Sequence, residues 1–206
     1  MKKILFSVLT LLLSFEVLAC SCQFHGLLAK WQRAEHVFIA DVTKLTTIEK
    51  GDTKNYREGK VRGDFNVISR FKGQPELITH LSSAHKPVCC TCSTTLKNDK
   101  YVVFTNKTGE LSLSSCSMTM LLNHASYYEE VLSRLSAGSE TQQFVGQYNS
   151  VKRVLTLDES EAHVAVHEFY FDFEVTNNDV IFEGYQLKDG SIFFTRVNTV
   201  TPIANE

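Results

Sequence analysis

The sequence predicts a mainly β protein, in which a small Greek-key barrel with flanking helices is followed by a short β-rich C-terminal segment. Three observations support this prediction. Runs of β-branched and aromatic residues recur along the chain between polar turns, as in antiparallel strands. Helical spacing of apolar residues is limited to two stretches, near residues 24–35 and 121–135. All six cysteines lie between Cys20 and Cys116, which separates a cysteine-containing part from a cysteine-free part.

In the first part, we expect several strands between two helices. A helix is predicted at 24–35, strands at 37–48, 61–71 and 77–82, a hairpin of 101–105 with 111–115 around Asn106 to Gly109, and a second helix at 121–135. Short antiparallel strands hide their edges best when they close into a small barrel. The first part is therefore expected to be a Greek-key barrel, with a linker at 136–139.

The second part, residues 140–206, is predicted to be a small β-meander of unknown role. Apolar and polar residues alternate from Phe169 to Val175, which is typical of a half-buried strand. Lys188-Asp189-Gly190-Ser191 is a strong turn signal between residues 185–187 and 192–194, so a hairpin is expected there.

Residues 1–19 have the pattern of a secretory signal. Two lysines precede an apolar run from Ile4 to Leu13, and Val17-Leu18-Ala19 offers a peptidase cleavage site. We therefore expect an exported protein, extracellular, periplasmic or attached to the outer envelope, whose mature chain begins at Cys20. The alternative is a lipoprotein, because Val17 to Cys20 also forms a loose lipobox; Val17 and Leu18 fit that motif poorly.

The cysteines fall into three groups, which are Cys20 with Cys22, then Cys89, Cys90 and Cys92, then Cys116. An even number behind a secretory signal favours disulfides. Adjacent cysteines rarely bond each other without strain, so the N-terminal pair is expected to bond the later groups. A thiolate metal site is the alternative, but Cys-x-x-Cys spacing is missing and the compartment is oxidising.

Residues 20 to about 120 resemble the netrin-like (NTR) modules, and among them the tissue inhibitors of metalloproteinases (TIMPs). The resemblance rests on several motifs in the same order: Cys20-Ser21-Cys22, Arg33 to Val42, Phe65-Asn66-Val67, Phe71-Lys72-Gly73, Cys92, Tyr101 to Phe104, and Leu113 to Ser117. It implies an OB-like Greek-key barrel for a domain spanning residues 20–136. Nothing in it extends to residues 140–206.

The resemblance also implies a disulfide pairing. It pairs Cys20 with Cys92 (or Cys90) and Cys22 with Cys116. The chain departs from the family in its middle group, which usually holds one cysteine followed by glycine. Cys89 and Cys90 are left over, and they either bond each other, stay reduced or pair between chains.

In the inhibitors that the chain resembles, the first cysteine chelates the catalytic zinc of a target protease through its amine and carbonyl. Carried over, Cys20 would be the chelating residue, and Ser21 would enter the pocket beside the zinc. The resemblance thus implies a binding module that inhibits zinc metalloendopeptidases, or that binds another extracellular or envelope protein. The alternative is a lipoprotein anchored through Cys20, which serves as a protein-interaction module without inhibition.

Other functional classes have little support in the sequence. A net charge of -2 and the lack of a basic stripe argue against nucleic-acid binding. His163 and His167 share a face, but they lack the remaining zincin motif and are expected to be exposed strand histidines. We expect no enzyme, no cofactor and no metal of the protein's own, and membrane attachment only if Cys20 is lipidated.

Overall fold

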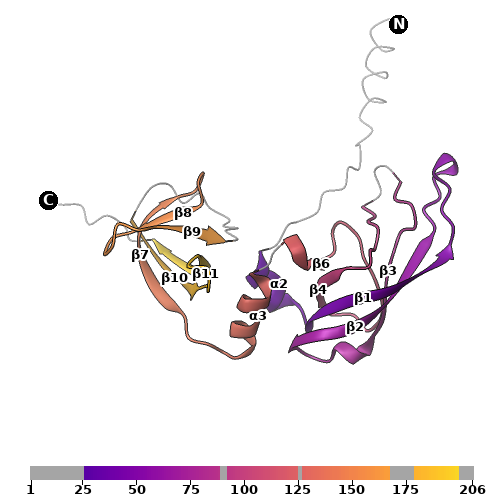
Figure 1. Ribbon diagram of the computed structural model, residues 1–206, viewed down its shortest axis with the longest axis horizontal. Coiled ribbons are helices and arrows are strands. Elements are labelled where there is room, and N and C mark those ends of the chain that lie inside the picture. Colours follow the sequence, from indigo (N-terminus) through magenta and orange to yellow (C-terminus); the bar gives the residue numbers. More distant parts are fainter. Residues whose placement is uncertain (1–25, 89–91, 125–126, 168–178, 200–206) are drawn as a thin grey trace, which may run out of the picture.

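The computed structural model describes residues 26–88, 92–124, 127–167 and 179–199, and it shows two β regions (Figure 1). The first is a curled six-stranded sheet with two helices, and the second is a closed five-stranded barrel. The mainly β class with flanking helices is confirmed. None of the helices within the described ranges is long and apolar enough to cross a membrane. The predicted strand at 169–175 lies outside the described residues.

The elements of the first region follow the chain in a simple order. They are α2 (Leu27–Arg33), β1 (His36–Glu49), η1 (Thr53–Asn55), β2 (Lys60–Lys72), η2 (Pro75–Leu77), β3 (Ile78–Ser83), β4 (Lys100–Thr105), β5 (Gly109–Ser112), β6 (Met120–Leu121), η3 (Leu122–His124) and α3 (Tyr128–Ser136). The barrel contains β7 (Gln142–Asn149), β8 (Val154–Leu157), β9 (His163–His167), β10 (Asp179–Gln186) and β11 (Ile192–Thr199).

The first sheet has the strand order β5-β3-β2-β1-β4-β6. The run β3-β2-β1-β4 is a Greek key, since the fourth strand returns beside the first. β5 then pairs with β3 in parallel, so the sheet curls as a partly open OB-like barrel. The predicted hairpin of β4 with β5 is wrong. β4 pairs with β1 and β6, and the turn ending at Gly109 (φ 76°) leads into β5, which pairs with β3 instead of β4.

Both faces of β4 and of the first half of β1, up to Val42, are buried, which explains the apolar runs there. Val37, Ile39, Val102 and Phe104 face a core shared with α2 and α3. Their neighbours Phe38, Ala40, Val42, Tyr101 and Val103 face the interior of the curl. A strand covered on both sides cannot alternate in polarity, because every side chain leaves water.

The second predicted helix begins later than expected. Leu121 lies in β6, and α3 begins at Tyr128 rather than near residue 121. Its buried residues are Tyr128, Val131 and Leu132, which pack on the outer face of the first sheet. The apolar spacing therefore predicts the helix correctly for the second half of residues 121–135 only.

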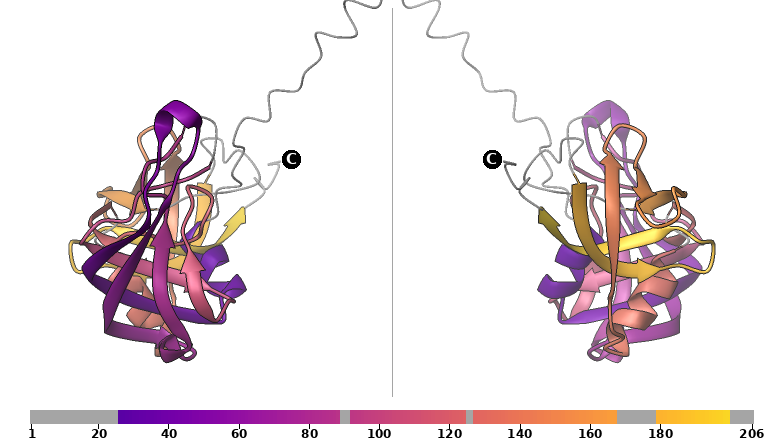
Figure 2. Two further views of the ribbon diagram at one scale, coloured as in Figure 1. Left: turned by 90° about the vertical axis from the view of Figure 1, so that its right-hand side faces the viewer. Right: turned by 90° about the vertical axis from the view of Figure 1, so that its left-hand side faces the viewer.

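The C-terminal region is more than a meander. β7, β8 and β9 follow one another antiparallel, as expected, and the predicted β10–β11 hairpin is confirmed. β10 also pairs with β7, and β11 pairs with β9 in parallel, which closes the barrel. The right-hand view of Figure 2 looks toward these strands. Phe182 and Phe194 stack inside with ring centroids 3.9 Å apart, and Tyr148 meets Phe182 edge-on.

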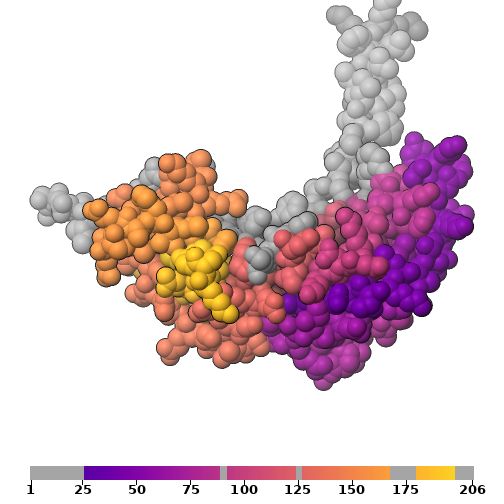
Figure 3. All heavy atoms as spheres, viewed as in Figure 1, coloured from indigo at the N-terminus to yellow at the C-terminus, as the bar shows by residue number. Residues whose placement is uncertain are grey.

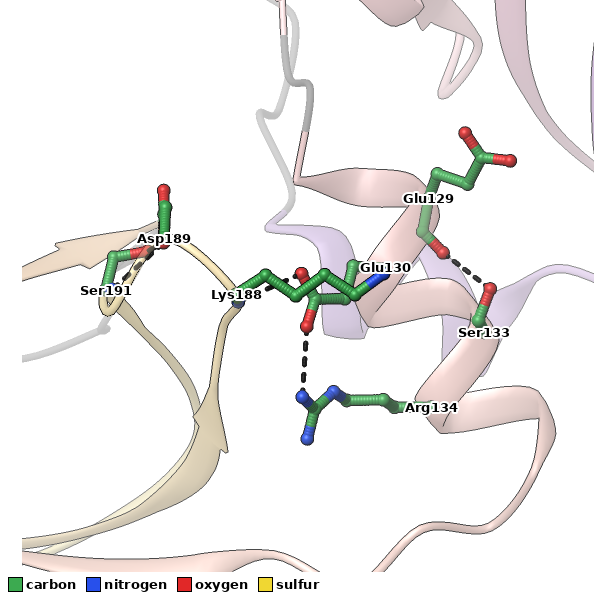
Figure 4. Close-up of polar contacts among 7 residues, drawn as sticks. All are labelled: Glu129, Glu130, Ser133, Arg134, Lys188, Asp189 and Ser191. Carbon is green, nitrogen blue, oxygen red and sulfur yellow. Dashed lines mark hydrogen bonds and ion pairs between the residues drawn. The ribbon is translucent and has the colours of Figure 1, made fainter.

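The two regions share one apolar joint. Tyr185, Leu187 and Phe193 of the barrel belong to the same buried cluster as α2 and α3. Polar bonds surround this cluster (Figure 4): Glu130 accepts hydrogen bonds from the Lys188 backbone N–H at 3.2 Å and from Arg134 at 3.0 Å. The barrel is therefore held against α3 by the shared apolar cluster and by the hydrogen bond from Lys188 to Glu130.

Candidate functional site

The candidate site is a solvent-open hollow around Cys92, at one end of the curled sheet. We call it the Cys92 hollow. It is lined by the loop side of the β1–β2 hairpin, the last residues of β3, the end of β5 and the chain beside Cys92, namely Glu49, Glu58, Gly59, Lys60, Ser82, Ser83, Ala84, Cys92, Ser93, Ser112, Leu113 and Ser114. Five of these residues are serines, so hydroxyl groups are frequent in a wall that also exposes apolar surface.

Glu58, which lines the hollow, forms hydrogen bonds to the chain on both sides of Cys92. Its carboxylate accepts hydrogen bonds from the Val88 N–H at 3.2 Å and the Ser93 hydroxyl at 2.5 Å, and its carbonyl accepts one from Lys86 N–H at 2.9 Å. His85 accepts a bond from the Gly51 N–H. A chain segment outside helices and strands forms few backbone hydrogen bonds. These bonds to side chains therefore hold the segment in place beside the hollow.

Cys92 and Cys116 meet at this site although 24 positions separate them. The Cys92 carbonyl accepts bonds from the Ser115 N–H at 2.7 Å and the Ser115 hydroxyl at 3.0 Å. Ser93 and Ser114 form an isolated β-bridge beside them. Both cysteines are disulfide-bonded. The other predicted site residues (Cys20, Ser21, Cys22, Cys89 and Cys90) lie outside the described residues, so the pairing stays a prediction.

A charged pair borders the hollow. The Lys60 ammonium lies 2.5 Å from Glu110, which stands on β5 next to Ser112. Hydrogen bonding from Lys60, and then from Ser82, lowers the pKa of the Glu110 carboxyl. Both partners are over a third exposed, so water screens the pair and its contribution to stability is small.

The two predicted strand histidines lie in different surroundings. His163 is exposed and its ring meets the Thr156 hydroxyl at 2.9 Å. His167 is half-buried at the joint, where its ring stacks on Tyr127 at 4.1 Å. Within the described ranges, no group of three His, Cys, Asp or Glu side chains is placed to hold a metal ion.

The hollow can therefore hold a segment with mixed polar groups, through serine hydroxyls, a lysine and two carboxylates. The serines were not predicted from the sequence because they come from three separate segments and follow no spacing rule. No protein-family model matches the chain, and no curated protein matches it either.

Proposed function

We propose that the chain is an exported, non-enzymatic binding module of the netrin-like type, which presents its mature N-terminus at the Cys92 hollow. The observation that carries this proposal is that Cys92 lies at an open, serine-rich site and bonds Ser115, the neighbour of Cys116. Cys20 and Cys22 are two positions apart, so their Cα atoms are at most about 7 Å apart. Their disulfide partners must therefore be near neighbours, and Cys92 and Cys116 satisfy this requirement.

Inhibition of zinc metalloendopeptidases is the activity that this arrangement favours. A disulfide at Cys20 holds the backbone of the first residue, so little conformational entropy is lost when its amine and carbonyl bind the zinc of a protease. These two atoms would displace the zinc-bound water, and Ser21 would enter the neighbouring pocket. The open side of the hollow leaves room for the partner's surface.

The first test is the intact mass of the exported protein, followed by peptide mapping without reduction. The proposal expects a mass equal to residues 20–206 less the hydrogens lost in bridges, and a fragment that joins Cys22 to Cys116. Free thiols at Cys20 and Cys22 would overturn it. A lipid-sized increment would remove inhibition, since the Cys20 sulfur and amine would both be modified, and would favour the anchored module.

The second test is titration against a panel of zinc endopeptidases. One alanine added before Cys20 should abolish inhibition, because the chelating amine becomes an amide. Ser93→Ala serves as a matched control, since it changes the hollow and leaves the amine free. Inhibition that survives the added alanine would show that zinc chelation by Cys20 is the wrong mechanism.

A further inference from the structure

The tip of the β1–β2 hairpin is an exposed turn that carries a large aromatic side chain. We define the hairpin tip as residues 50–58, between the ends of β1 and β2. Figures 1 and 3 show it at the end of the molecule away from the barrel, and the left view of Figure 2 shows it at the upper end of the sheet. Tyr56 is 79% exposed there, and Ile48, just before the tip, is 52% exposed.

The hairpin tip is held rigidly despite its exposure. Asp52 and Arg57 exchange two backbone hydrogen bonds, at 2.6 and 2.9 Å. The Asp52 carboxylate also accepts bonds from the Lys54 N–H and the Asn55 side chain, which lower the pKa of Asp52. The tip is thus a closed turn with a fixed shape.

Tyr56 occupies an unfavourable backbone conformation in this turn. Its φ of 54° lies in the left-handed region, which costs a non-glycine residue roughly 1 kcal/mol or more. The ring makes no compensating burial, since most of it faces water. Strain together with an exposed aromatic ring is typical of a residue that is presented for binding.

The segment that carries this ring has an excess of positive charge. Residues 44–60 hold five lysines or arginines and three acidic residues, whereas the whole chain has a net charge of -2. Arg57 pairs with Glu49 and Lys60 with Glu110, but no ion pair within the described ranges involves Lys50 or Lys54. Lys86 is also close enough to lower the pKa of Asp52 by its charge.

We propose that the hairpin tip binds the surface of an anionic lipid bilayer, with Tyr56 at the headgroup level and Lys50, Lys54 and Lys86 facing the lipid phosphates. A tyrosine ring prefers this interface because one end is apolar and the other is polar. Lysines near an anionic surface are attracted to it. A narrow convex tip is poorly suited to a protein partner, because a stable protein interface needs a far larger area. A bilayer can instead deform around it.

The test is flotation of the processed chain with vesicles of equal parts phosphatidylglycerol and phosphatidylcholine, compared with phosphatidylcholine alone. We expect binding to the anionic vesicles only, weakened by salt. The double variant K50E/K54E should lower the partition coefficient at least about twentyfold, since each lysine contributes roughly a factor of five. Tyr56→Ser should lower it several-fold.

A matched control is available on a turn of the barrel. Val151 is 93% exposed on the β7–β8 turn and is followed by Lys152. V151S/K152E changes apolar exposure and charge at a turn of the barrel, and it should leave binding unchanged. Every variant carries the same processed N-terminus, so any contribution from Cys20 cancels, and circular dichroism checks folding. Equal binding to neutral vesicles, no binding by the parent chain, or equal losses in the control would each overturn the proposal.

Discussion

The two regions of this chain bury a β core by different means. In the barrel, the parallel pairing of β9 with β11 completes a ring of five strands, and no cysteine occurs after Cys116. In the first region, β5 and β6 remain edges, and residues 84–99 include no helix or multi-residue strand among those described. A closed ring of hydrogen bonds needs no covalent support, whereas an open sheet with a long irregular segment benefits from disulfides.

Reduction of the disulfides should separate the two regions most strongly. Each bridge closes a long loop and typically contributes about 2 to 5 kcal/mol. We expect reduction to destabilise residues 26–124 by that amount per bridge, and to leave the barrel folded. Hydrogen exchange measured on peptides from both regions checks this, with alkylation without reduction as control. Equal loss of protection in the barrel would show that the two regions unfold as one unit.

Removal of an aromatic ring from the barrel should have the converse effect. Phe182 is fully buried and lies between the rings of Phe194 and Tyr148. Phe182→Ala should destabilise the barrel by about 3 to 5 kcal/mol, because transfer free energy is lost and a cavity remains.

Urea unfolding gives the size of this effect, and hydrogen exchange gives its location. Val145→Ala, at a position 41% exposed on β7, is the control and should cost under about 1 kcal/mol. A loss confined to the first region after Phe182→Ala would contradict the assignment of Phe182 to a separate barrel core.

The joint between the two regions can be weakened by a substitution that lies outside the strands. Leu187 is 4% exposed and packs in the cluster that α3 shares with the barrel. Leu187→Ala should cost about 2 kcal/mol, at the low end for buried leucine because the site borders the surface. It should also widen the temperature difference between the unfolding of the two regions.

The single tryptophan, Trp31, packs against the same cluster from α2 and reports the first region by fluorescence. Differential scanning calorimetry then reports both regions. Val151→Ala, fully exposed on a turn, is the control for this experiment. An unchanged temperature difference in Leu187→Ala would show that the joint does not couple the regions.

Local signals in the sequence predicted much of this fold. α2, β1, β2 and the β10–β11 hairpin lie within a few residues of their predicted positions, because apolar periodicity and turn residues specify them directly. The errors concern long-range pairing. The turn before Gly109 has the composition of a hairpin turn, yet the strand after it, β5, pairs with β3 and not with β4. Composition alone does not specify which strand will be the partner.

The candidate site was predictable only in part. The cysteines were visible in the sequence as a group, because cysteine is rare and its chemistry is narrow. The joint and the serine-lined wall were not, since Tyr185, Leu187 and Phe193 follow ordinary strand patterns. The neighbouring region determines which outer face of the barrel is covered. A local sequence pattern carries no information about that contact.

The smallest expected effect concerns acid sensitivity at the open sheet edge of the first region. Lys60 on β2 holds the pKa of Glu110 on edge strand β5 below its usual value of 4.5. A carboxyl whose pKa is lowered on folding contributes stability above its unfolded pKa, and this contribution is lost as pH falls through the folded pKa. The first region should therefore lose this contribution below about pH 4.5.

Lys60→Ala tests this contribution directly. It should raise the pKa of Glu110 toward 4.5 and make the stability of the first region less dependent on pH in the acid range. The side-chain carboxyl signal of Glu110 in an NMR titration gives the pKa, and urea midpoints at several pH values give the stability. Lys44→Ala is the matched control, because Lys44 is an exposed lysine of the same sheet with no ion pair in the described ranges. A Glu110 pKa that shifts equally in both variants would show that general charge, rather than the Lys60 contact, sets it.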